Sequence, residues 1–354
     1  MRSAVWEGIG RIGLVEVDDP VPGPHDVVLG VAACGICGSD VHAFAEGVWI
    51  TAGAPMGHEF SGTVSAVGTG IRELKVGDRV AVNPMGPCGS CRQCSLGRTN
   101  LCSAPASSAR GGLSDKVLVP NAESGARLHR MPDTMSVEEG AFLEPLSVAT
   151  RAVASAGPDL DGPIVVAGLG SIGQGVLRVL LAYGARDVVG IDVSPARLAA
   201  ASGLGAVVLD ARAEDARSHL LDRWGTSTSP YQVAGNVGTF FECSGAPPMI
   251  ALATEVVRAG GVVSVAGLVG AAPPVDLDTV VQKELRLLGS FAYTGPDATE
   301  AFRLLADGLV DVTPLVSHRV PLSRVAEAFD TQHAVDGSVK VLVLPDPAAD
   351  PQES

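Results

Sequence analysis

Four cysteines stand close together in the first third of the chain, separated by short spacers: Cys88, Cys91, Cys94 and Cys102. Four thiolates on one short loop are the ligand set that a tetrahedral zinc ion takes in structural sites. Since all four positions would be protein ligands, the pattern predicts a structural zinc. An iron–sulfur cluster, which four cysteines can also hold, is the less favoured alternative.

A second set of ligand types is more widely spaced: Cys37, the neighbours His58 and Glu59, and Glu144. A catalytic zinc needs about three protein ligands and one exchangeable position, and Cys37, His58 and a carboxylate would supply them. Such a zinc acts as a Lewis acid on an alcohol oxygen and lowers its pKa, so that hydride can leave the carbinol carbon. Taken alone, Glu144 would more often be a helix-start charge ahead of Pro145.

Oxidation of an alcohol also releases a proton, and two residues near Cys37 could carry it away. Ser39 offers a hydroxyl at the expected N-cap of a helix, and His42 offers an imidazole on the first turn of that helix. A hydroxyl next to a titratable imidazole is a plausible relay. A lone histidine here would more often be a surface or capping residue, so the relay depends on the metal ligands and on a cofactor site.

The cofactor site is indicated by the segment Gly168-Leu169-Gly170-Ser171-Ile172-Gly173, which follows a short apolar strand and begins a helix. The glycines permit a tight turn and a close approach to a pyrophosphate, and the helix N-terminus offers N–H groups to its oxygens. Asp192 ends the next expected strand, where it can bind both adenosine ribose hydroxyls and repel a 2′-phosphate. NAD is therefore expected in preference to NADP. Arg197 could weaken that preference, or be a solvated helix residue.

The elements that must hold these residues change in kind along the chain. Short β-branched runs cut by Gly, Pro and Asp predict a β-rich module in the first third, with strands over 27–31, 62–67, 78–82 and 116–119. Residues 137–156 favour helix, and Gly157-Pro158 breaks it.

Strands and helices alternate through the middle of the chain. Strands are expected over 164–167, 188–191, 206–209, 239–242 and 262–266, and helices over 171–183, 195–202 and 249–258. Such alternation is typical of a parallel, doubly wound sheet. After Gly289 the pattern is mixed, with helices near 299–307 and 324–332 and a last strand over 339–344, which indicates a return to the first domain.

Composition excludes several classes of protein. The chain has 354 residues, of which 46% are hydrophobic, so two domains with sizeable cores are expected and a disordered chain is not. With 25 basic and 39 acidic residues, the formal net charge of −14 argues against nucleic acid as a partner. The N-terminus lacks a signal-peptide core, and the apolar runs are shorter than the roughly 20 residues of a membrane span. A soluble, cytoplasmic protein is expected.

In these motifs the chain resembles the zinc-dependent medium-chain alcohol dehydrogenases over nearly its whole length. The matching segments are 35–42, 57–62, 76–80, 88–102 and 168–173, with Asp192. The resemblance implies an α/β plus β-rich architecture. A GroES-like catalytic domain would cover 1–144 and 291–354, with its structural zinc lobe at 86–103. A doubly wound Rossmann domain over 145–290 would bind NAD, with the active site between the domains. Homodimers or homotetramers are also implied.

The same resemblance assigns roles to the site residues. Those implied to serve the reaction are Cys37, Ser39, His42, His58, Glu59 and Glu144. Either Glu59 or Glu144 can be the carboxylate on the catalytic zinc, Glu144 directly or through a water, depending on the catalytic state. Lys340, in the last strand, stands where the family often has a basic residue near the cofactor pyrophosphate.

The segment Leu143-Glu144-Pro145-Leu146 narrows the resemblance to the sorbitol, threonine and 2,3-butanediol dehydrogenases, because simple alcohol dehydrogenases usually have a cysteine in place of the glutamate. Sorbitol dehydrogenases carry an Arg-Tyr pair that contacts the polyol, and here Ala292 replaces that arginine before Tyr293. Apolar candidates for the pocket are Phe44, Trp49 and Phe291. We therefore expect hydride transfer between NAD and a secondary alcohol, vicinal diol or hydroxyketone, a biosynthetic cyclitol or sugar intermediate among them.

Alternatives remain open from the sequence. The same machinery would serve a polyol (sorbitol-type) or an L-threonine-type dehydrogenase. From another class, a non-catalytic NAD- or zinc-binding regulatory protein would lack Cys37, His58 or the relay residues, and none of these is missing. For an oligomer, we expect the edge of the Rossmann sheet near 262–266, followed by Pro273-Pro274, to extend across a dimer.

Overall fold

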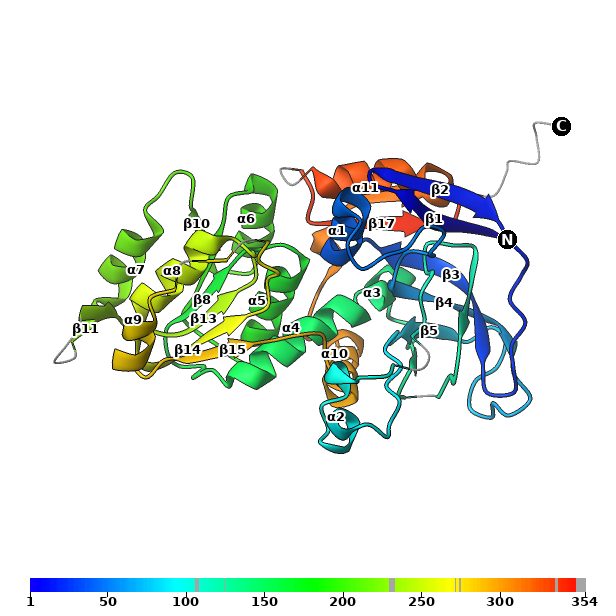
Figure 1. The fold of residues 1–354 in the computed structure, drawn as a ribbon, viewed down its shortest axis with the longest axis horizontal. Helices are drawn as coiled ribbons and strands as arrows, with labels where there is room; N and C mark the ends of the chain where they lie inside the picture. Colours follow the sequence, from blue (N-terminus) through cyan, green and yellow to red (C-terminus); the bar gives the residue numbers. More distant parts are fainter. Residues whose placement is uncertain are drawn as a thin grey trace. The chain divides into compact units, whose positions relative to one another are not determined.

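The computed structural model describes residues 1–105, 108–123, 125–228, 233–270, 272–273, 275–334 and 337–347. The chain divides into two compact units, whose elements are labelled in Figure 1. The first unit comprises Met1–Pro145, Thr294–Ala306 and Val316–Ser354. The second comprises Leu146–Tyr293 and Asp307–Leu315.

The first unit is built around a seven-stranded sheet with the order β16-β17-β3-β4-β5-β7, in which β6 also pairs with β3. Its strands are β3 (Val27–Gly35), β4 (Glu59–Val67), β5 (Arg79–Val82), β6 (Lys116–Val119), β7 (Leu128–Arg130), β16 (Val316–Pro321) and β17 (Lys340–Leu344). Beside it, β1 (Arg2–Gly8) and β2 (Arg11–Glu16) form a hairpin. The strands predicted in the first third are confirmed, and β3 and β4 are longer than predicted.

The core of the first unit lies between this sheet and two helices, α1 (Gly38–Glu46) and α11 (Val325–His333). Phe44 of α1 packs against Phe329 of α11, with ring centroids 5.1 Å apart. Phe44 is only 7% exposed and belongs to this core. The prediction that Phe44 lines a substrate pocket is therefore wrong, because the helix pairing buries its ring.

The helix predicted over 137–156 is two helices, α3 (Val137–Ala141) and α4 (Leu143–Ala156). In one continuous helix, the backbone nitrogen of Pro145 would have to donate to the carbonyl of Ala141. Proline has no N–H, and its ring would clash with that carbonyl. Restarting the helix at Leu143 puts Pro145 into a first turn, where no N–H is needed. Glu144 is thereby held in the first turn of α4.

The second unit contains a six-stranded parallel sheet with the order β10-β9-β8-β13-β14-β15. Its strands are β8 (Ile164–Ala167), β9 (Val188–Asp192), β10 (Val207–Asp210), β13 (Val237–Glu242), β14 (Val257–Val265) and β15 (Arg286–Gly289). Its helices include α5 (Ser171–Ala182), α6 (Pro195–Ser202), α7 (Ala216–Trp224), α8 (Pro247–Val256) and α9 (Leu277–Gln282). A short hairpin joins β11 (Thr226–Thr228) to β12 (Val233–Gly235).

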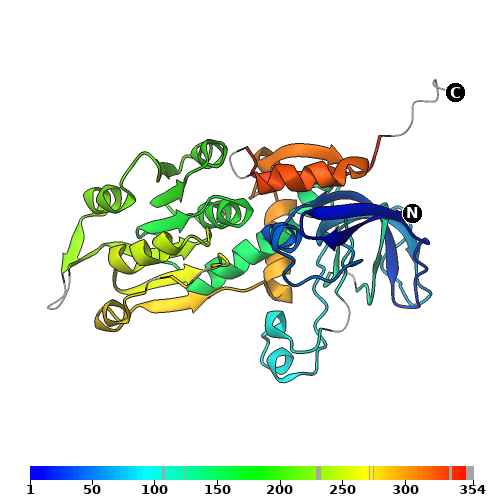
Figure 2. The ribbon, with the colours of Figure 1, turned by 45° about the horizontal axis from the view of Figure 1, so that its top comes forward.

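The strand order confirms the predicted doubly wound sheet, and Figures 1 and 2 show helices on both of its faces. The chain moves outward from β8 to β9 and β10, then returns to the other side of β8 with β13. The carboxyl ends of β8 and β13 therefore form a topological switch point, where such sheets bind ligands. The segment Asp307–Leu315 joins this unit, and Nε of Arg178 in α5 donates to the carbonyl of Asp311 at 2.8 Å.

The strand predicted at the sheet edge is an inner one. β14, which includes the expected residues 262–265, pairs with β13 on one side and β15 on the other. β15 is the outer strand of the sheet. Its residues, Arg286-Leu287-Leu288-Gly289, include no β-branched side chain, so they carry little strand signal. Of the predicted Pro273-Pro274 segment, Pro274 lies outside the described residues.

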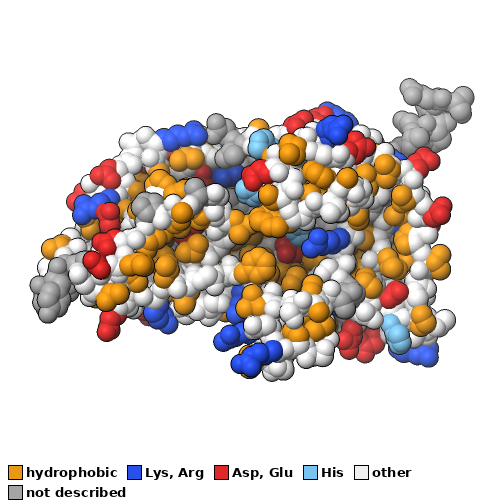
Figure 3. Space-filling model, in the orientation of Figure 1, with side chains coloured by type: hydrophobic (Ala, Val, Ile, Leu, Met, Phe, Trp, Pro, Cys, Tyr) orange, Lys and Arg blue, Asp and Glu red, His pale blue; other side chains and the backbone are white. Residues whose placement is uncertain are grey.

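No helix in the described part of the chain is both long and apolar enough to cross a bilayer. On the face drawn in Figure 3, lysine and arginine side chains lie in small groups among acidic and apolar ones. This distribution agrees with the acidic net charge.

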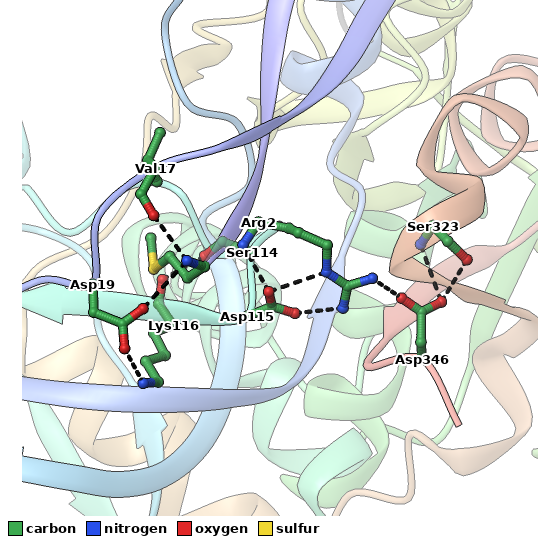
Figure 4. A network of polar contacts seen from close by, with 9 residues as sticks. Arg2, Val17, Asp19, Ser114, Asp115, Lys116, Ser323 and Asp346 are labelled. Atoms are coloured by element: carbon green, nitrogen blue, oxygen red, sulfur yellow. Dashed lines mark hydrogen bonds and ion pairs between the residues drawn. The ribbon is translucent and has the colours of Figure 1, made fainter. Parts of the chain in front are cut away.

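A network of ion pairs joins the N-terminal strand to two distant segments (Figure 4). Arg2 donates from Nε and Nη2 to Asp115, at 3.1 and 2.6 Å, and from Nη1 to Asp346. Asp346, which follows β17, also accepts the backbone N–H of Ser323 at 3.2 Å. One guanidinium thus connects three parts of the first unit, and its hydrogen bonds lower the pKa of the Asp115 carboxyl.

Replacing Arg2 with glutamine is expected to lower the free energy of unfolding by about 1 kcal/mol, the upper range for exposed pairs with bidentate geometry. Because Arg2 lowers the folded pKa of Asp115 below its unfolded value of 3.8, this contribution is complete at neutral pH and is lost as pH falls through the folded pKa. Denaturant unfolding of both proteins, near neutral pH and again at acid pH, measures it.

Arg324→Gln is the matched control, because it removes an exposed pair with Glu327 that connects only neighbouring residues. It should change the free energy of unfolding very little. Equal losses in the two variants would show that the Arg2 network contributes nothing beyond an ordinary surface pair.

Candidate active site and dinucleotide site

A metal-ligand cluster in the first unit is assembled by the pairing of two strands. β3 and β4 run antiparallel, with Gly35 opposite Glu59. Cys37 follows the end of β3 and His58 precedes β4, so this register brings both residues beside Glu59. One ligand atom from each of Cys37, His58 and Glu59 lies within 4.8 Å of the others. The structure thus unites three of the four residues predicted to bind a catalytic zinc.

Asp40 orients this cluster from the first turn of α1. Its Oδ2 accepts the backbone N–H of Cys37 at 3.1 Å, and its Oδ1 lies 3.4 Å from Nδ1 of His58. Burial alone would lower the pKa of His58, but the Asp40 carboxylate outweighs burial and raises it well above its usual value. The contact leaves Nε2 as the ring nitrogen for a metal. Sequence analysis missed Asp40, although its place three residues after Cys37 is typical of a capping carboxylate.

Glu59 forms a buried ion pair with Lys340. Nζ of Lys340 lies 2.6 Å from Oε2 of Glu59 and donates to the carbonyl of Ile36 at 3.2 Å. The two side chains are 2% and 1% exposed. Burial alone would lower the pKa of Lys340, but the charge and hydrogen bond of Glu59, together with the charges of Cys37 and Glu144, outweigh it and raise that pKa. The ammonium is thus engaged by Glu59 and Ile36 inside the first unit, and its contact with the cofactor pyrophosphate stays a prediction.

The donors of the cluster fit a zinc ion. They are a thiol, an imidazole and a carboxylate, all of which zinc accepts as ligands. Oε1 of Glu59 is buried and has no hydrogen-bond partner among the residues described. Buried polar atoms normally have a partner, so this oxygen is an acceptor left for a cation.

Glu144, the fourth predicted ligand, is 8% exposed. Among the described residues, its carboxylate is outside the group whose ligand atoms lie within 4.8 Å of one another. Burial raises the pKa of Glu144 to about 7, a rise that His58 opposes and Glu59 reinforces. Glu144 is therefore close enough to the cluster for its pKa to depend on the charges of His58 and Glu59.

The two predicted relay residues lie on α1. The N-cap of this helix is Cys37, so the predicted capping role of Ser39 is wrong, and Ser39 is the second residue of the helix. Nδ1 of His42 lies 2.8 Å from Oε1 of Glu46, one turn later. A hydrogen bond at Nδ1 leaves Nε2 of His42 available as an acceptor. The His42 side chain is 42% exposed, so its ring can exchange protons with solvent.

The four cysteines of the predicted zinc lobe converge. Helix α2 (Arg92–Ser95) and the 3₁₀ turn η1 (Thr99–Leu101) fold the segment back on itself. The sulfur atoms of Cys88, Cys91, Cys94 and Cys102 all lie within 4.8 Å of one another, and each cysteine is free. Backbone N–H groups of Cys88 and Cys91 approach sulfur atoms at 3.3 Å, an arrangement that favours thiolates. The structure thus contains the Cys₄ site expected for a structural zinc.

The thiols of this lobe oppose one another's ionisation. Backbone N–H groups of Cys94 and Ser103 lower the pKa of Cys91 to about 5. Burial, together with the neighbouring Cys91, raises the pKa of Cys94 to about 12. Four thiolates this close can coexist only with a cation among them, which is the environment that zinc provides.

The glycine turn of the second unit lies between β8 and α5, at the switch point. Gly168 has a φ of 85°, and a Cβ there would lie 2.5 Å from the Cα of Ser244. A Cβ at Gly173 would lie 1.7 Å from the carbonyl oxygen of Gly168. Side chains are therefore excluded at both positions. Gly170 is the N-cap of α5, and residues 171–173 form its first turn, whose N–H groups suit a phosphate.

Asp192 lies beside this turn at the end of β9. Its Oδ2 accepts the N–H of Leu169 at 2.6 Å, and its Oδ1 accepts the next two backbone N–H groups at 2.7 and 2.8 Å. Nη1 of Arg197 lies 4.0 Å from Oδ2 of Asp192. A Cβ at Gly170 would lie 3.7 Å from the same Nη1. The structure thus brings Asp192 and Arg197 together at the glycine turn.

The remaining pocket candidates have different surroundings. Trp49 is 69% exposed with a φ of 60°, and its ring meets His42 edge-on at 6.4 Å. Phe291, in the second unit, is 61% exposed. Tyr293 is buried, and Ala292 before it has a φ of 48°. Trp49 and Phe291 therefore offer apolar surface, whereas Tyr293 belongs to the interior.

Known families match both units. Residues 23–133 match the family model of the alcohol dehydrogenase GroES-like domain, and residues 171–307 match that of the zinc-binding dehydrogenases. The first match contains the Cys37 cluster and the cysteine lobe, and the second begins at the first residue of α5.

Relatives are similar to the chain over nearly its whole length. Sorbitol dehydrogenase of Homo sapiens is 35% identical over 365 residues, covering 98% of this chain and 96% of the relative. D-xylulose reductase A of Aspergillus niger is 33% identical over 352 residues, covering 96% of each. The solved structure of a candidate zinc-binding dehydrogenase from Sinorhizobium meliloti 1021, bound to NADP, has a TM-score of 0.86 and 30% identity, covering 97% of this chain and 99% of that one.

Single substitutions should separate the two metal sites. Wild-type protein is expected to hold about two zinc ions per chain, and Cys88→Ser and Cys37→Ser about one each. Cys88→Ser should also lower Tm, because the metal organises a loop with little core of its own. Cys37→Ser should change Tm less, because the strands around it are already packed. Elemental analysis after desalting, with thermal unfolding, measures both; a wild-type count of one would leave only a single metal site.

Proposed function

The chain belongs to the zinc-dependent medium-chain alcohol dehydrogenase family, and we propose that it transfers a hydride between NAD and a secondary alcohol, vicinal diol or hydroxyketone. The observation that carries the proposal is the cluster of Cys37, His58 and Glu59, whose ligand atoms lie within 4.8 Å of one another. We propose the sequence-based boundaries as the functional domain division, a catalytic domain over 1–144 and 291–354 and an NAD-binding domain over 145–290; the compact units differ from it mainly at Asp307–Leu315, which packs with the second unit.

The proposed chemistry divides between the bound groups and the chain. Zinc held by the cluster would supply Lewis acidity towards the alcohol oxygen, and NAD would accept the hydride. Cys37 and His58 hold the metal, and Asp40 keeps the His58 ring in the tautomer that presents Nε2. Lys340 holds one oxygen of Glu59 and leaves the other for the metal. Glu144 is the neighbouring carboxylate that can replace Glu59 on it.

The substrate proton leaves through α1 in this proposal. Ser39 would accept it from the alcohol while donating its own hydroxyl proton to Nε2 of His42, and His42 would then release a proton to solvent. Glu46 supports this direction, because its contact with Nδ1 of His42 leaves Nε2 to accept the proton. The partial exposure of the ring connects it to water.

NAD is the proposed cofactor, held by Gly168, Gly170, Gly173 and the intervening Ser171 and Ile172. The N-terminus of α5 supplies N–H groups to the pyrophosphate, which the negative net charge of the protein would otherwise repel. Asp192 disfavours a 2′-phosphate at the adenosine ribose. Arg197 stands next to it and reduces that penalty, so NADP should be used less well than NAD rather than excluded.

The substrate class follows from the absence of one arginine. Ala292 supplies no hydrogen-bond donor where sorbitol dehydrogenases carry a guanidinium, and the exposed Trp49 and Phe291 offer apolar surface. Both favour a substrate with one or two hydroxyl groups over a hexitol. A polyol substrate is the second candidate, supported by the relatives named sorbitol dehydrogenase and D-xylulose reductase.

A substrate panel tests the proposed function. NADH formation should be fastest with secondary alcohols and vicinal diols such as 2,3-butanediol, and at least about tenfold slower in kcat/KM with sorbitol, xylitol or L-threonine, a difference near 1.4 kcal/mol. NAD should support higher kcat/KM than NADP. Turnover of hexitols or threonine alone would overturn the substrate class. Unchanged activity in Cys37→Ala would overturn the catalytic zinc.

We also propose that two copies associate through β15 as a homodimer, which could pair further into a tetramer. Within the described chain, β15 pairs only with β14, so its outer edge can receive a second β15. Leu277 and Val281 lie one turn apart on α9 and are 66% and 72% exposed, and Leu287 of β15 is 43% exposed.

A reducing, cytoplasmic setting is proposed as well, because it keeps the zinc-binding thiols reduced.

Leu287→Lys should shift the protein from dimer towards monomer, because it would bury two facing charges across the two-fold interface. Light scattering coupled to gel filtration measures the mass. Leu309→Lys is the matched control: this leucine is also about half exposed (52%) and lies in the same unit, on the segment Asp307–Leu315 rather than on β15. A monomeric wild type, or an unchanged dimer in Leu287→Lys, would reject this interface.

A further inference from the structure

A buried carboxylate stands at the switch point of the second unit without a role in the predicted chemistry. Glu242 is the last residue of β13 and is 0% exposed. Its Oε1 accepts the backbone N–H groups of Ser244 and Gly245, at 2.8 and 2.9 Å, and the hydroxyl of Ser244. Three donors from one turn therefore converge on a single charged oxygen, and such charge-assisted hydrogen bonds are stronger than neutral ones.

The turn that Glu242 holds packs directly on the glycine turn. A Cβ at Gly168 would lie 2.5 Å from both the N and the Cα of Ser244. The backbone of Ser244 thus fills the space that the absent side chain leaves. A displacement of this turn would change the wall against which residues 168–173 are packed.

Glu242 also connects to the loop after β14. Its carbonyl accepts the N–H groups of Ala266 and Gly267, at 2.8 and 3.0 Å. A Cβ at Gly267 would lie 2.7 Å from Oε2 of Glu242 and 2.3 Å from the nitrogen of Gly245. Three loops, after β8, β13 and β14, are therefore packed backbone to backbone around one carboxylate.

We propose that Glu242 is a positioning residue for the nicotinamide half of the cofactor, an inference that rests on the proposed NAD site. A doubly wound sheet binds a dinucleotide with its two halves, one on each side of the switch point. Asp192 belongs to the half formed by β8, β9 and β10, where the adenosine binds. Glu242 belongs to the half formed by β13, β14 and β15. Its carboxylate shapes the turns of that half without touching the cofactor, because it is fully buried.

This placement predicts a selective loss of affinity. Glu242→Gln keeps an acceptor for the turn but removes the charge, and it buries an amide NH₂ against Gly267 where Oε2 now lies. NADH should bind about tenfold more weakly, the difference between charge-assisted and neutral hydrogen bonds. AMP, which needs only the adenosine half, should bind within about twofold of wild type.

The experiment measures NADH binding by fluorescence titration, and AMP binding by calorimetry, on the zinc-loaded protein. Ser244→Ala is the second variant, because it removes one of the three donors and leaves the buried charge in place; it should weaken NADH binding in the same direction by a smaller factor. Ser264→Ala is the matched control: Ser264 is a buried polar residue of the neighbouring strand β14, and its side chain should not affect either ligand.

The possible outcomes distinguish failure of this inference from failure of the proposed NAD-dependent function. Selective weakening of NADH in Glu242→Gln and Ser244→Ala, with zinc content unchanged, supports it. Equal weakening of NADH and AMP, or no weakening of either, overturns it while the proposed function stands. Should Glu242→Gln fail to fold, Ser244→Ala with unchanged NADH affinity also overturns it. A wild-type protein that binds no NADH overturns both.

Discussion

The ion pair between Glu59 and Lys340 holds the centre of the first unit together. The two residues begin β4 and β17, the strands on either side of β3 in the sheet, and their side chains meet across the end of β3 at the carbonyl of Ile36. Transfer of two charges from water to such a place is costly, and only good geometry with further hydrogen bonds offsets the cost. Loss of either partner would leave an uncompensated buried charge. His58 directly precedes Glu59, and Cys37 directly follows Ile36, whose carbonyl accepts from Lys340, so the positions of both depend on this pair.

The second unit uses carboxylates in a different way. Asp192 and Glu242 each accept several backbone N–H groups from the loops that follow β8, β9 and β13. Their negative charge is therefore offset locally by backbone dipoles. This arrangement lets a strongly acidic protein build a crevice for an anionic cofactor, since the acids shape the loops while the N-terminus of α5 remains free for phosphate. The net charge of the chain says little about the potential at this one place.

Prediction from sequence succeeded where the determining forces act between near neighbours. The strands over 164–167 and 116–119 and the helix over 195–202 agree with the structure to the residue. The break between α3 and α4 could have been predicted as well, because the missing N–H of Pro145 acts only four residues away. β15 could not, since Arg286-Leu287-Leu288-Gly289 has no β-branched residue and ends in glycine, and the strand forms through its pairing with β14.

The sequence by itself determined which residue types form the cysteine lobe and the glycine turn, and so which groups these two sites could bind. Four cysteines within one short loop, and glycines where a turn meets a helix, indicate their chemistry through local spacing, because each of these two sites takes its donors from a single short segment. Tertiary structure decided what each distant residue does. Strand register makes Lys340 the ion-pair partner of Glu59, and Asp40 contacts His58 only when β3 and β4 pair. Phe44 is part of the core because α11 packs against it. Lys340 and Glu59, for example, are 281 positions apart, and no local pattern records such contacts.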